Sequence, residues 1–303
     1  MTSMNKKLRI AFIGCVESSF RALNTLINMD CVEVCGVVTR KHSKVNSDFV
    51  DLSSLCEEKN IPYYFENPQE RQGTYQFLKS FELDVIYCFG WSYLLKKETL
   101  ELTEYGVIGF HPAKLPANRG RHPLIWALTL GLEETASTFF KMDEGADSGP
   151  ILSQRAIIIE KSDNATSLYN KVLAVANEQI VEFTQELHNG TAKFYEQNDQ
   201  QANYWRKRSR KDGLIDWRMT ANTIHNLIRS LAAPYPGAEF SVNEKLFTVM
   251  GSTPIFDTYP VNIEPGKVLS IKENELLVKC AGRDAIWLHN IDPNALNEIG
   301  EYL

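Results

Sequence analysis

The sequence predicts an α/β protein in which a doubly wound, mainly parallel sheet is followed by a smaller, β-rich C-terminal domain. Two patterns lead to this prediction. In the earlier part of the chain the strands read as continuous apolar runs, as in Leu8–Gly14 and Val32–Thr39, and helical segments separate them. Such runs are typical of a parallel sheet that helices cover on both faces. The later part changes to short alternating strands with turns between them, which indicates a small antiparallel domain.

Each element of the sheet follows from the local periodicity of apolar residues. A helix is expected to begin near Ser18 or Ser19, because a serine hydroxyl at the N-cap accepts a free backbone N–H. The other expected helices are Val50–Glu58, Gly73–Ser80, Leu124–Leu130 and Thr166–Leu187. The expected strands are Leu8–Gly14, Val32–Thr39, Ile61–Phe65, Asp84–Phe89, Val107–Phe110, Ser137–Met142 and Arg155–Ile159.

A polar and basic stretch, Asn189–Asp212, indicates where one domain ends and the next begins. We expect an N-terminal catalytic domain at residues 1–203, a linker at 204–212 and the C-terminal domain at 213–303. Within that last part the expected helix is Thr220–Ala232, and the expected strands are Lys245–Met250, Gly266–Ile271, Glu275–Cys280 and Ala285–Ile291.

Composition excludes several classes of protein. The 303 residues are 44% hydrophobic and 23% charged, as in ordinary soluble proteins. No apolar run approaches the ~18 residues of a membrane span, and no signal peptide is recognisable, so we expect a cytoplasmic protein without membrane partners. The six cysteines lack CxxC spacing and fit reduced core thiols better than disulfides or a zinc site. A net charge of -6 argues against a surface built entirely for nucleic acid.

The stretch from Tyr105 to Gln154 contains the residues best suited to chemistry. The strand Val107–Phe110 leads to His111 and a loop rich in proline and glycine, and a second loop carries Asp147 after the next expected strand. Ligands gather at the ends of strands in such sheets, so the two loops could meet. An imidazole held beside a carboxylate suits proton transfer near neutral pH. Taken alone, the pairing is poor evidence, because a loop histidine and a helix-capping aspartate explain the two residues better.

The segments around His111 and Asp147 resemble motifs of the family of formyltransferases that use 10-formyltetrahydrofolate. His111–Pro116 (HPAKLP) and Asn118–Ala127 (NRGRHPLIWA) resemble its H-x-S-L-L-P and R-G-x-x-P loop, and Met142–Gly149 (MDEGADSG) resembles its M-D-E-G-x-D-T/S-G. Similarity continues through Arg206–Trp217 and Pro234–Ala238. The resemblance implies a Rossmann-like formyltransferase fold with an OB-like C-terminal domain, and transfer of a formyl group to a primary amine without a metal.

Roles for individual residues also follow from the resemblance. His111 matches the histidine that moves the proton or stabilises developing charge, and Asp147 matches the aspartate that positions it. Arg119 and Arg121 could contact a pyrophosphate or could brace the loop, and Pro116 belongs to the same substrate loop. The residues expected to contact the folate are Phe89, Gly90, Trp91, Tyr93, Leu94, Met142, Asp143, Gly145 and Ala146.

One position departs from the family pattern. The family has an asparagine two residues before the histidine, and its amide donates to the oxyanion, whereas this chain has Gly109. Losing such a donor typically costs ~10²–10³ in rate. A backbone amide or protonated His111 could substitute, Asn118 could reach in, or the chain could have lost activity. We favour the first explanation, because glycine permits close approach of backbone or substrate.

The acceptor amine is not fixed by the resemblance. We expect the amine of a UDP-, dTDP- or GDP-linked amino sugar, as used for surface polysaccharides such as the O-antigen of lipopolysaccharide. Methionyl-tRNA is the second candidate, and a catalytically silent folate- or nucleotide-binding homologue is the third. A tRNA enzyme needs a broadly basic face, but Arg206–Lys211 is the only dense basic cluster and the tail is rich in acids. Oligomeric state is left open, a homodimer included.

Overall fold

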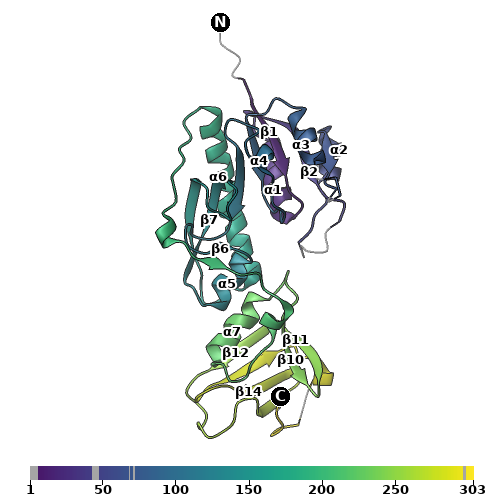
Figure 1. The fold of residues 1–303 in the computed structure, drawn as a ribbon. Helices are drawn as coiled ribbons and strands as arrows, with labels where there is room; N and C mark the ends of the chain where they lie inside the picture. The colour runs from purple at the N-terminus through teal and green to yellow at the C-terminus, as the bar shows by residue number, and fades with distance from the viewer. Residues whose placement is uncertain (1–5, 43–47, 68, 71, 296–297) are drawn as a thin grey trace. The chain divides into compact units, whose positions relative to one another are not determined.

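The computed structural model describes residues 6–42, 48–67, 69–70, 72–295 and 298–303 (Figure 1). The chain packs into two compact units. The first consists of Met1–Gly120, Ala136–Ile157 and Lys171–Tyr204, and the second of Arg121–Thr135, Ile158–Asn170 and Trp205–Leu303. The second unit therefore includes two segments that precede the predicted linker. The division into domains at 1–203, 204–212 and 213–303 stays a prediction.

A seven-stranded sheet forms the centre of the first unit within the described residues. Its strand order is β3-β2-β1-β4-β5-β7-β8. The pairs among β1 to β5 are parallel, whereas β7 runs antiparallel to β5. The strands are β1 (Leu8–Ile13), β2 (Val32–Thr39), β3 (Tyr63–Phe65), β4 (Val85–Cys88), β5 (Val107–His111), β7 (Glu134–Lys141) and β8 (Ile151–Ile158). The mainly parallel sheet predicted from the apolar runs is confirmed.

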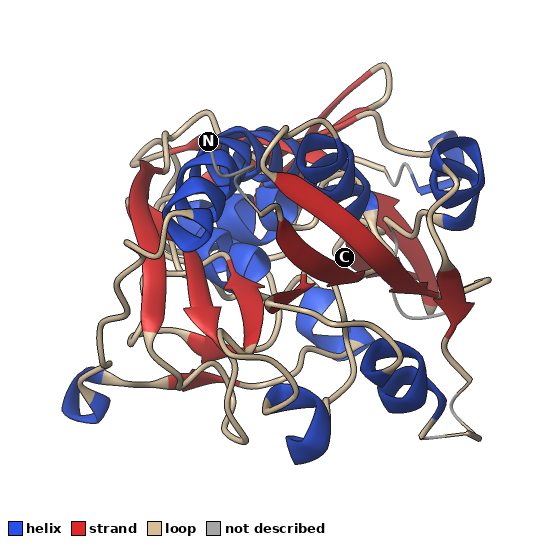
Figure 2. Ribbon diagram, turned by 90° about the horizontal axis from the view of Figure 1, so that it is seen from above, coloured by secondary structure: helices blue, strands red, loops and turns tan. Residues whose placement is uncertain are grey.

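Helices pack against both faces of this sheet. Figure 2 distinguishes helices in blue from strands in red. Leu23 of α1 and Ile180 of α6 join the core on one face, and Leu78 of α3 and Leu100 of α4 join a second cluster. The helices with residues in the first unit are α1 (Glu17–Ile27), α2 (Ser53–Lys59), α3 (Gly73–Lys79), α4 (Lys97–Leu100) and α6 (Ala165–His188), and the short pieces are β6 (Arg119–Gly120), β9 (Tyr204–Trp205) and η1 (Asp199–Gln201). The helix α5 (Pro123–Thr129) and the short piece η2 (Arg210–Gly213) belong to the second unit.

The start of α1 differs from the expectation. The helix begins at Glu17, so Ser18 and Ser19 lie inside its first turn rather than at the N-cap. The Ser19 hydroxyl accepts the Val16 N–H at 3.2 Å and donates to the Phe89 carbonyl at 2.6 Å. This serine therefore ties the turn after β1 to the end of β4, which is a long-range role that local propensity does not reveal.

The second unit contains a strand-rich C-terminal part, as predicted. Its four-stranded antiparallel sheet has the order β12-β15-β14-β13, and β10 pairs with β11. Thr220 caps α7 by accepting the Thr223 N–H at 3.2 Å. Trp217 and Phe240 lie in its core. The elements are α7 (Ala221–Ser230), β10 (Ala238–Val242), β11 (Lys245–Val249), β12 (Gly251–Ile255), β13 (Val268–Lys272), β14 (Glu275–Lys279), β15 (Ala285–His289) and η3 (Pro293–Ala295).

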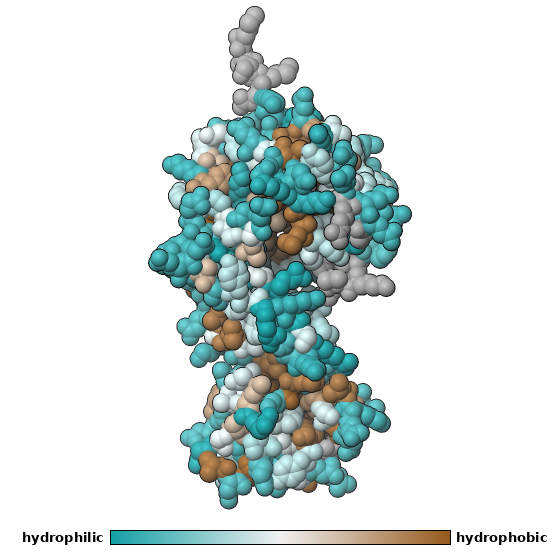
Figure 3. Space-filling view, in the orientation of Figure 1, coloured by the Kyte–Doolittle hydropathy of each residue, from teal (hydrophilic) through white to brown (hydrophobic). Residues whose placement is uncertain are grey.

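One face of the molecule can be judged by its hydropathy. On the face seen in Figure 3 most residues are hydrophilic, and apolar residues form small separate patches. Among the described residues, no helix combines the length and the apolar character needed to cross a membrane.

Candidate active site

His111 is the last residue of β5, so the sheet fixes its backbone. The residue is 4% exposed. Its Nε2 lies 2.8 Å from the carbonyl oxygen of Asn118, and because a carbonyl only accepts, the Nε2 atom donates. The opposite nitrogen, Nδ1, lies 3.6 Å from Oδ2 of Asp147. The structure thus brings together the two residues that the sequence analysis paired.

Asp147 approaches His111 by a route that the sequence did not predict. Because β7 runs antiparallel to β5, the chain leaves β7 beside the start of β5, where the Met142 N–H donates to the Val107 carbonyl at 2.7 Å. The loop that follows returns Asp147 to His111. Asp147 has a φ of 56°, a left-handed conformation that aspartate tolerates better than most residues. Its Oδ2 also accepts the Gly120 N–H at 2.8 Å.

The pair has a definite electrostatic character. A separation of 3.6 Å is too long for a hydrogen bond, so the carboxylate acts on the ring through its charge. Both neighbours of the His111 ring, the Asn118 carbonyl and the Asp147 carboxylate, are acceptors. With Nε2 donating to the Asn118 carbonyl, Nδ1 is the ring atom that faces the carboxylate. An imidazole held in this way is placed to move a proton or to stabilise a developing oxyanion.

Gly109 lies buried in the middle of β5, between Cys88 of β4 and Phe140 of β7. A Cβ built there would come within 2.7 Å of Cγ and 3.1 Å of Sδ of Met142. The thioether of Met142 therefore occupies the space above this glycine. An asparagine at residue 109 would have to displace a flexible side chain, and the structure gives its amide no prepared position.

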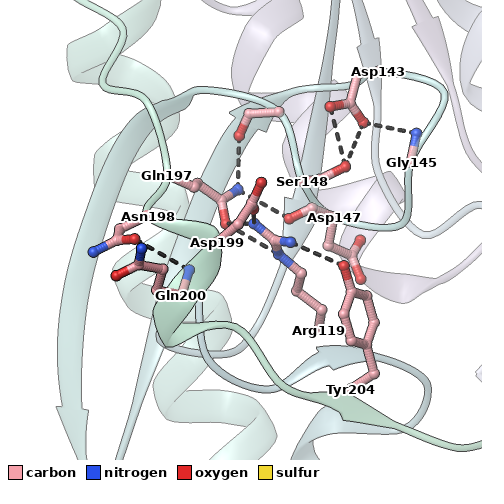
Figure 4. A network of polar contacts seen from close by, with 11 residues as sticks. Arg119, Asp143, Gly145, Asp147, Ser148, Gln197, Asn198, Asp199, Gln200 and Tyr204 are labelled. Carbon is pink, nitrogen blue, oxygen red and sulfur yellow. Dashed lines mark hydrogen bonds and ion pairs between the residues drawn. The ribbon is translucent and has the colours of Figure 1, made fainter.

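Arg119 has a different environment from that of a surface anion ligand. It is 1% exposed, and its guanidinium donates to Oε1 of Gln197 at 2.8 and 3.2 Å, to Asp199 at 2.8 Å and to the Tyr204 hydroxyl at 2.9 Å (Figure 4). Burial alone lowers the pKa of Arg119. The hydrogen bonds that its guanidinium donates to Tyr204 and Asp199 outweigh this effect, so the pKa is raised overall. This geometry favours the loop brace over the pyrophosphate ligand, the two alternatives that the sequence left open.

The other residues of the predicted substrate loop lie on either side of Arg119. Pro116 is half-buried and follows a cis peptide bond, and the carbonyl of Leu115 accepts from Gln154 at 2.9 Å. Arg121 is exposed and belongs to the second unit. An exposed guanidinium is available to a phosphate, whereas that of Arg119 is engaged.

The predicted folate segment begins where β4 ends. Phe89 is 2% exposed and packs edge-on against Phe139, so its side chain belongs to the core. Its carbonyl accepts from Ser19. Gly90 has a φ of 67°, and a Cβ there would lie 2.1 Å from Val16 and 2.6 Å from the Ser19 hydroxyl. Only glycine fits this turn, which brings the following residues past the start of α1.

Trp91, Tyr93 and Leu94 extend from this turn toward the surface. The Trp91 and Tyr93 rings meet at 5.7 Å, and the guanidinium of Arg40 lies 4.4 Å from the Tyr93 ring. Tyr93 is 42% exposed and Leu94 is 91% exposed. The side chains of Tyr93 and Leu94 are therefore accessible to a ligand.

The second predicted folate segment is near the first. Met142 packs against the same apolar cluster as Trp91. Asp143 shapes the loop beyond it by accepting the Gly145 N–H at 2.9 Å and the Ser148 hydroxyl at 2.8 Å (Figure 4). Gly145 and Ala146 are exposed at its tip. The two segments expected to contact folate thus converge, although their contacts with folate stay a prediction.

A small cavity of about 20 Å³ lies on the face of the sheet that α1 and α6 cover. It holds about one water molecule, which is far too little space for a pterin or a sugar. Its lining includes Ser18, Phe89, Phe110, Phe139 and Asn177. Within the part of the chain that the structure describes, no group of three or more His, Cys, Asp or Glu side chains could hold a metal ion.

Comparison with known proteins identifies the chain. Residues 8–184 match the family model described as formyl transferase, and residues 207–300 match the model of the formyl transferase C-terminal domain. The chain belongs to the formyl transferase family. The protein is therefore a formyl-transferring enzyme, and the predicted Rossmann-like sheet with a strand-rich C-terminal domain is confirmed.

Solved structures share this fold. WlaRD, described as a sugar 3N-formyl transferase in the presence of dTDP and 5-N-formyl-THF, is 19% identical with a TM-score of 0.67, covering 93% of this chain and 97% of its own. The N-formyltransferase from Helicobacter canadensis, in complex with folinic acid and dTDP-3-aminofucose, is 18% identical with a TM-score of 0.68 and covers 93% and 98%. Methionyl-tRNA formyltransferase from Clostridium thermocellum is 18% identical with a TM-score of 0.58 and covers 81% and 93%.

Sequence reasoning missed the residues that hold the two loops of this formyltransferase together. Gln197, Asn203 and Tyr204 lie in the stretch interpreted as a polar connection between domains. Nothing in the local pattern separates Gln197 from Gln200, because both occur in a run of polar residues without periodicity. Their importance comes from contacts with a segment much earlier in the chain.

His122, which follows the substrate loop, supplies a test of the second unit. It is half-buried, and the structure provides no hydrogen-bond partner for its buried Nε2. Burial lowers its pKa, and the charges of Arg121, Arg208 and Lys207 lower it further. The folded protein therefore resists protonation of this ring more than the unfolded chain does.

The stability of the protein is expected to depend on pH through His122. Below the ordinary pKa of 6.5 the unfolded chain binds a proton that the folded chain does not, so acidification from there toward the lowered pKa favours unfolding. His122→Asn removes this contribution and suits the left-handed φ of 56°. Urea midpoints measured between pH 7 and 5 should fall less in this variant than in the wild type and in His42→Asn, an exposed control. Parallel curves for all three proteins would contradict the assignment.

Proposed function

We propose that this enzyme transfers the formyl group of 10-formyltetrahydrofolate to the primary amine of a nucleotide-linked amino sugar. The observation that carries formyl transfer is the contact of His111 with Asp147 at 3.6 Å in loops that the family model covers. The folate would lie along the turn Phe89–Leu94 and the loop after Met142, where aromatic and main-chain groups converge. Relatives with the same fold were solved with reduced folates and dTDP, which supports both substrate classes.

The proposed reaction uses few groups of the protein. The amine attacks the formyl carbon, negative charge develops on the formyl oxygen, and the folate nitrogen leaves with a proton. His111 supplies positive charge or a proton beside the developing oxyanion, and Asp147 holds the ring in place through its charge. Because Gly109 offers no side-chain donor, His111 has to carry more of this stabilisation than in relatives with an asparagine.

The ion pairs formed by the basic residues Arg206–Lys211 favour a sugar nucleotide over tRNA as the acceptor. Arg206 donates to Asp212 at 2.9 Å, and Arg210 donates to Glu239 at 2.8 Å. Arg206 and Arg208 also lie 5.2 and 4.7 Å from the Trp126 ring. These cations are largely matched by groups of their own unit, so they offer little to the extended phosphate backbone of a tRNA. A single diphosphate needs only one or two cations, and exposed Arg121 is one candidate.

A panel of acceptors tests this proposal. Tetrahydrofolate release is measured with 10-formyltetrahydrofolate and, in turn, UDP-, dTDP- and GDP-linked amino sugars and charged methionyl-tRNA. We expect turnover with at least one sugar nucleotide and none with the tRNA. Turnover with methionyl-tRNA alone would overturn the acceptor assignment. Folate binding without turnover on any acceptor would show a silent homologue.

A further inference from the structure

Gln197 connects the aspartate loop to the loop that carries Arg119. Its Nε2 donates to the carbonyl of Asp147 at 2.9 Å and to the carbonyl of Gly149 at 2.7 Å. Its Oε1 accepts two bonds from Arg119. Figure 4 shows these contacts converging on one side chain. The aspartate loop lies between β7 and β8. The two bonds from Gln197 hold its backbone at Asp147 and Gly149, and the Gly120 N–H holds the Asp147 carboxylate.

Arg119 stands between the two backbone groups that contact the catalytic pair. The carbonyl before it, from Asn118, accepts from His111, and the N–H after it, from Gly120, donates to Asp147. The Arg119 side chain is buried and has a fixed direction set by Gln197, Asp199 and Tyr204. Movement of Gln197 would therefore shift Asp147 directly and would loosen the backbone that contacts both members of the pair.

We propose that Gln197 is a positioning residue for catalysis, which sets the distance between Asp147 and His111 through the Arg119 side chain. This inference rests on the proposed formyl transfer. Gln197 itself does not contact the substrates; it fixes the carbonyl of the residue whose carboxylate faces the histidine. A misplacement of about 1 Å in such a site costs about 10²-fold in rate, so a single amide in this place has a measurable effect.

The alternative is that Gln197 only stabilises the fold. Two variants separate the readings. Gln197→Glu keeps an oxygen for Arg119 but replaces the two N–H donors with an oxygen that repels the carbonyls of Asp147 and Gly149. Gln197→Ala removes both sets of contacts. Gln200→Ala is the matched control, because Gln200 lies three residues away and is exposed, and its backbone N–H, which the substitution keeps, donates to Oδ1 of Asn198 at 3.1 Å (Figure 4).

Steady-state kinetics with the sugar nucleotide that the wild type turns over give the first readout. Both Gln197 variants should lower kcat by about 10- to 100-fold while KM for 10-formyltetrahydrofolate changes less than about twofold, and Gln200→Ala should match the wild type. A wild-type kcat in Gln197→Glu would overturn the proposal, as would a rise in KM without loss of kcat.

A double-mutant cycle gives the second readout. If Gln197 acts through Asp147, adding Gln197→Ala to Asp147→Asn should cause little further loss of kcat. If Gln197 acts independently, the two losses should multiply, and the proposal fails.

Ring ¹⁵N NMR of His111 keeps the inference testable even where no acceptor is turned over. The ring signals of His111, assigned with His111→Gln, should move in Gln197→Glu and stay in place in Gln200→Ala. Unmoved signals in a folded Gln197→Glu protein would show that Gln197 does not position this site. Moved signals together with an inactive wild type would refute the proposed function and leave the positioning inference standing.

Discussion

Replacing His111 by glutamine is expected to lower kcat by about 10²–10⁴-fold, the usual contribution of a positioned acid or base. The side chain is buried at the end of β5 and faces the acceptor oxygens of Asn118 and Asp147. A glutamine amide can still donate to the Asn118 carbonyl, so the loop keeps that contact. It can neither transfer a proton nor carry a positive charge, so the developing oxyanion loses its partner.

The comparison of two variants separates chemistry from structure. His111→Ala removes the Asn118 contact as well as the charge, and His111→Gln removes only the charge. We expect both to be nearly inactive in single-turnover assays, with folate binding retained by fluorescence titration. An active His111→Gln beside an inactive His111→Ala would mean that the histidine only supports the loop.

Asp147→Asn is expected to lower kcat by about 10²–10³-fold. Asparagine accepts the Gly120 N–H as aspartate does and tolerates the left-handed φ of 56°, so the backbone should be preserved. What is lost is the negative charge 3.6 Å from Nδ1 of His111. The ring of His111 then loses the charge that orients it.

Glu144→Gln is the control for this substitution. Glu144 lies in the same loop, is largely exposed and contacts only Lys97, at 3.8 Å, among the ion pairs of the described residues. Removing its charge should leave kcat within about twofold of the wild type, as for most surface changes. If both carboxylates prove equally important, the general negative charge of the loop matters rather than the position of Asp147.

Sequence patterns located most of the sheet because its strands are buried on both faces. Val32–Thr39 was predicted with the bounds that the structure shows, and Asp84–Phe89 differs from β4 by one residue at each end. Short elements such as β6 and α4 were missed, since a few residues carry no periodicity. The Ser18 and Ser19 cap was wrong because the Ser19 hydroxyl bonds across to β4, which local sequence cannot indicate.

The site was predicted only in part, because some of its contacts depend on residues far apart in the sequence. His111 and Asp147 were paired from family motifs, and the structure places them together. The antiparallel turn of β7 was not foreseen, because an apolar run does not show strand direction. The sequence also did not decide between the two roles of Arg119, although its contacts favour bracing of the loop. Burial of an arginine depends on partners such as Gln197, which lies much later in the chain.

A crystal structure with 5-formyltetrahydrofolate and the accepted nucleotide-linked amino sugar tests the spatial basis of this account most directly. We expect the formyl group beside the His111 ring, and the sugar amine about 3–3.5 Å from the formyl carbon. Density for the folate remote from His111, or an amine that no rotation of the sugar brings to the formyl carbon, would contradict it.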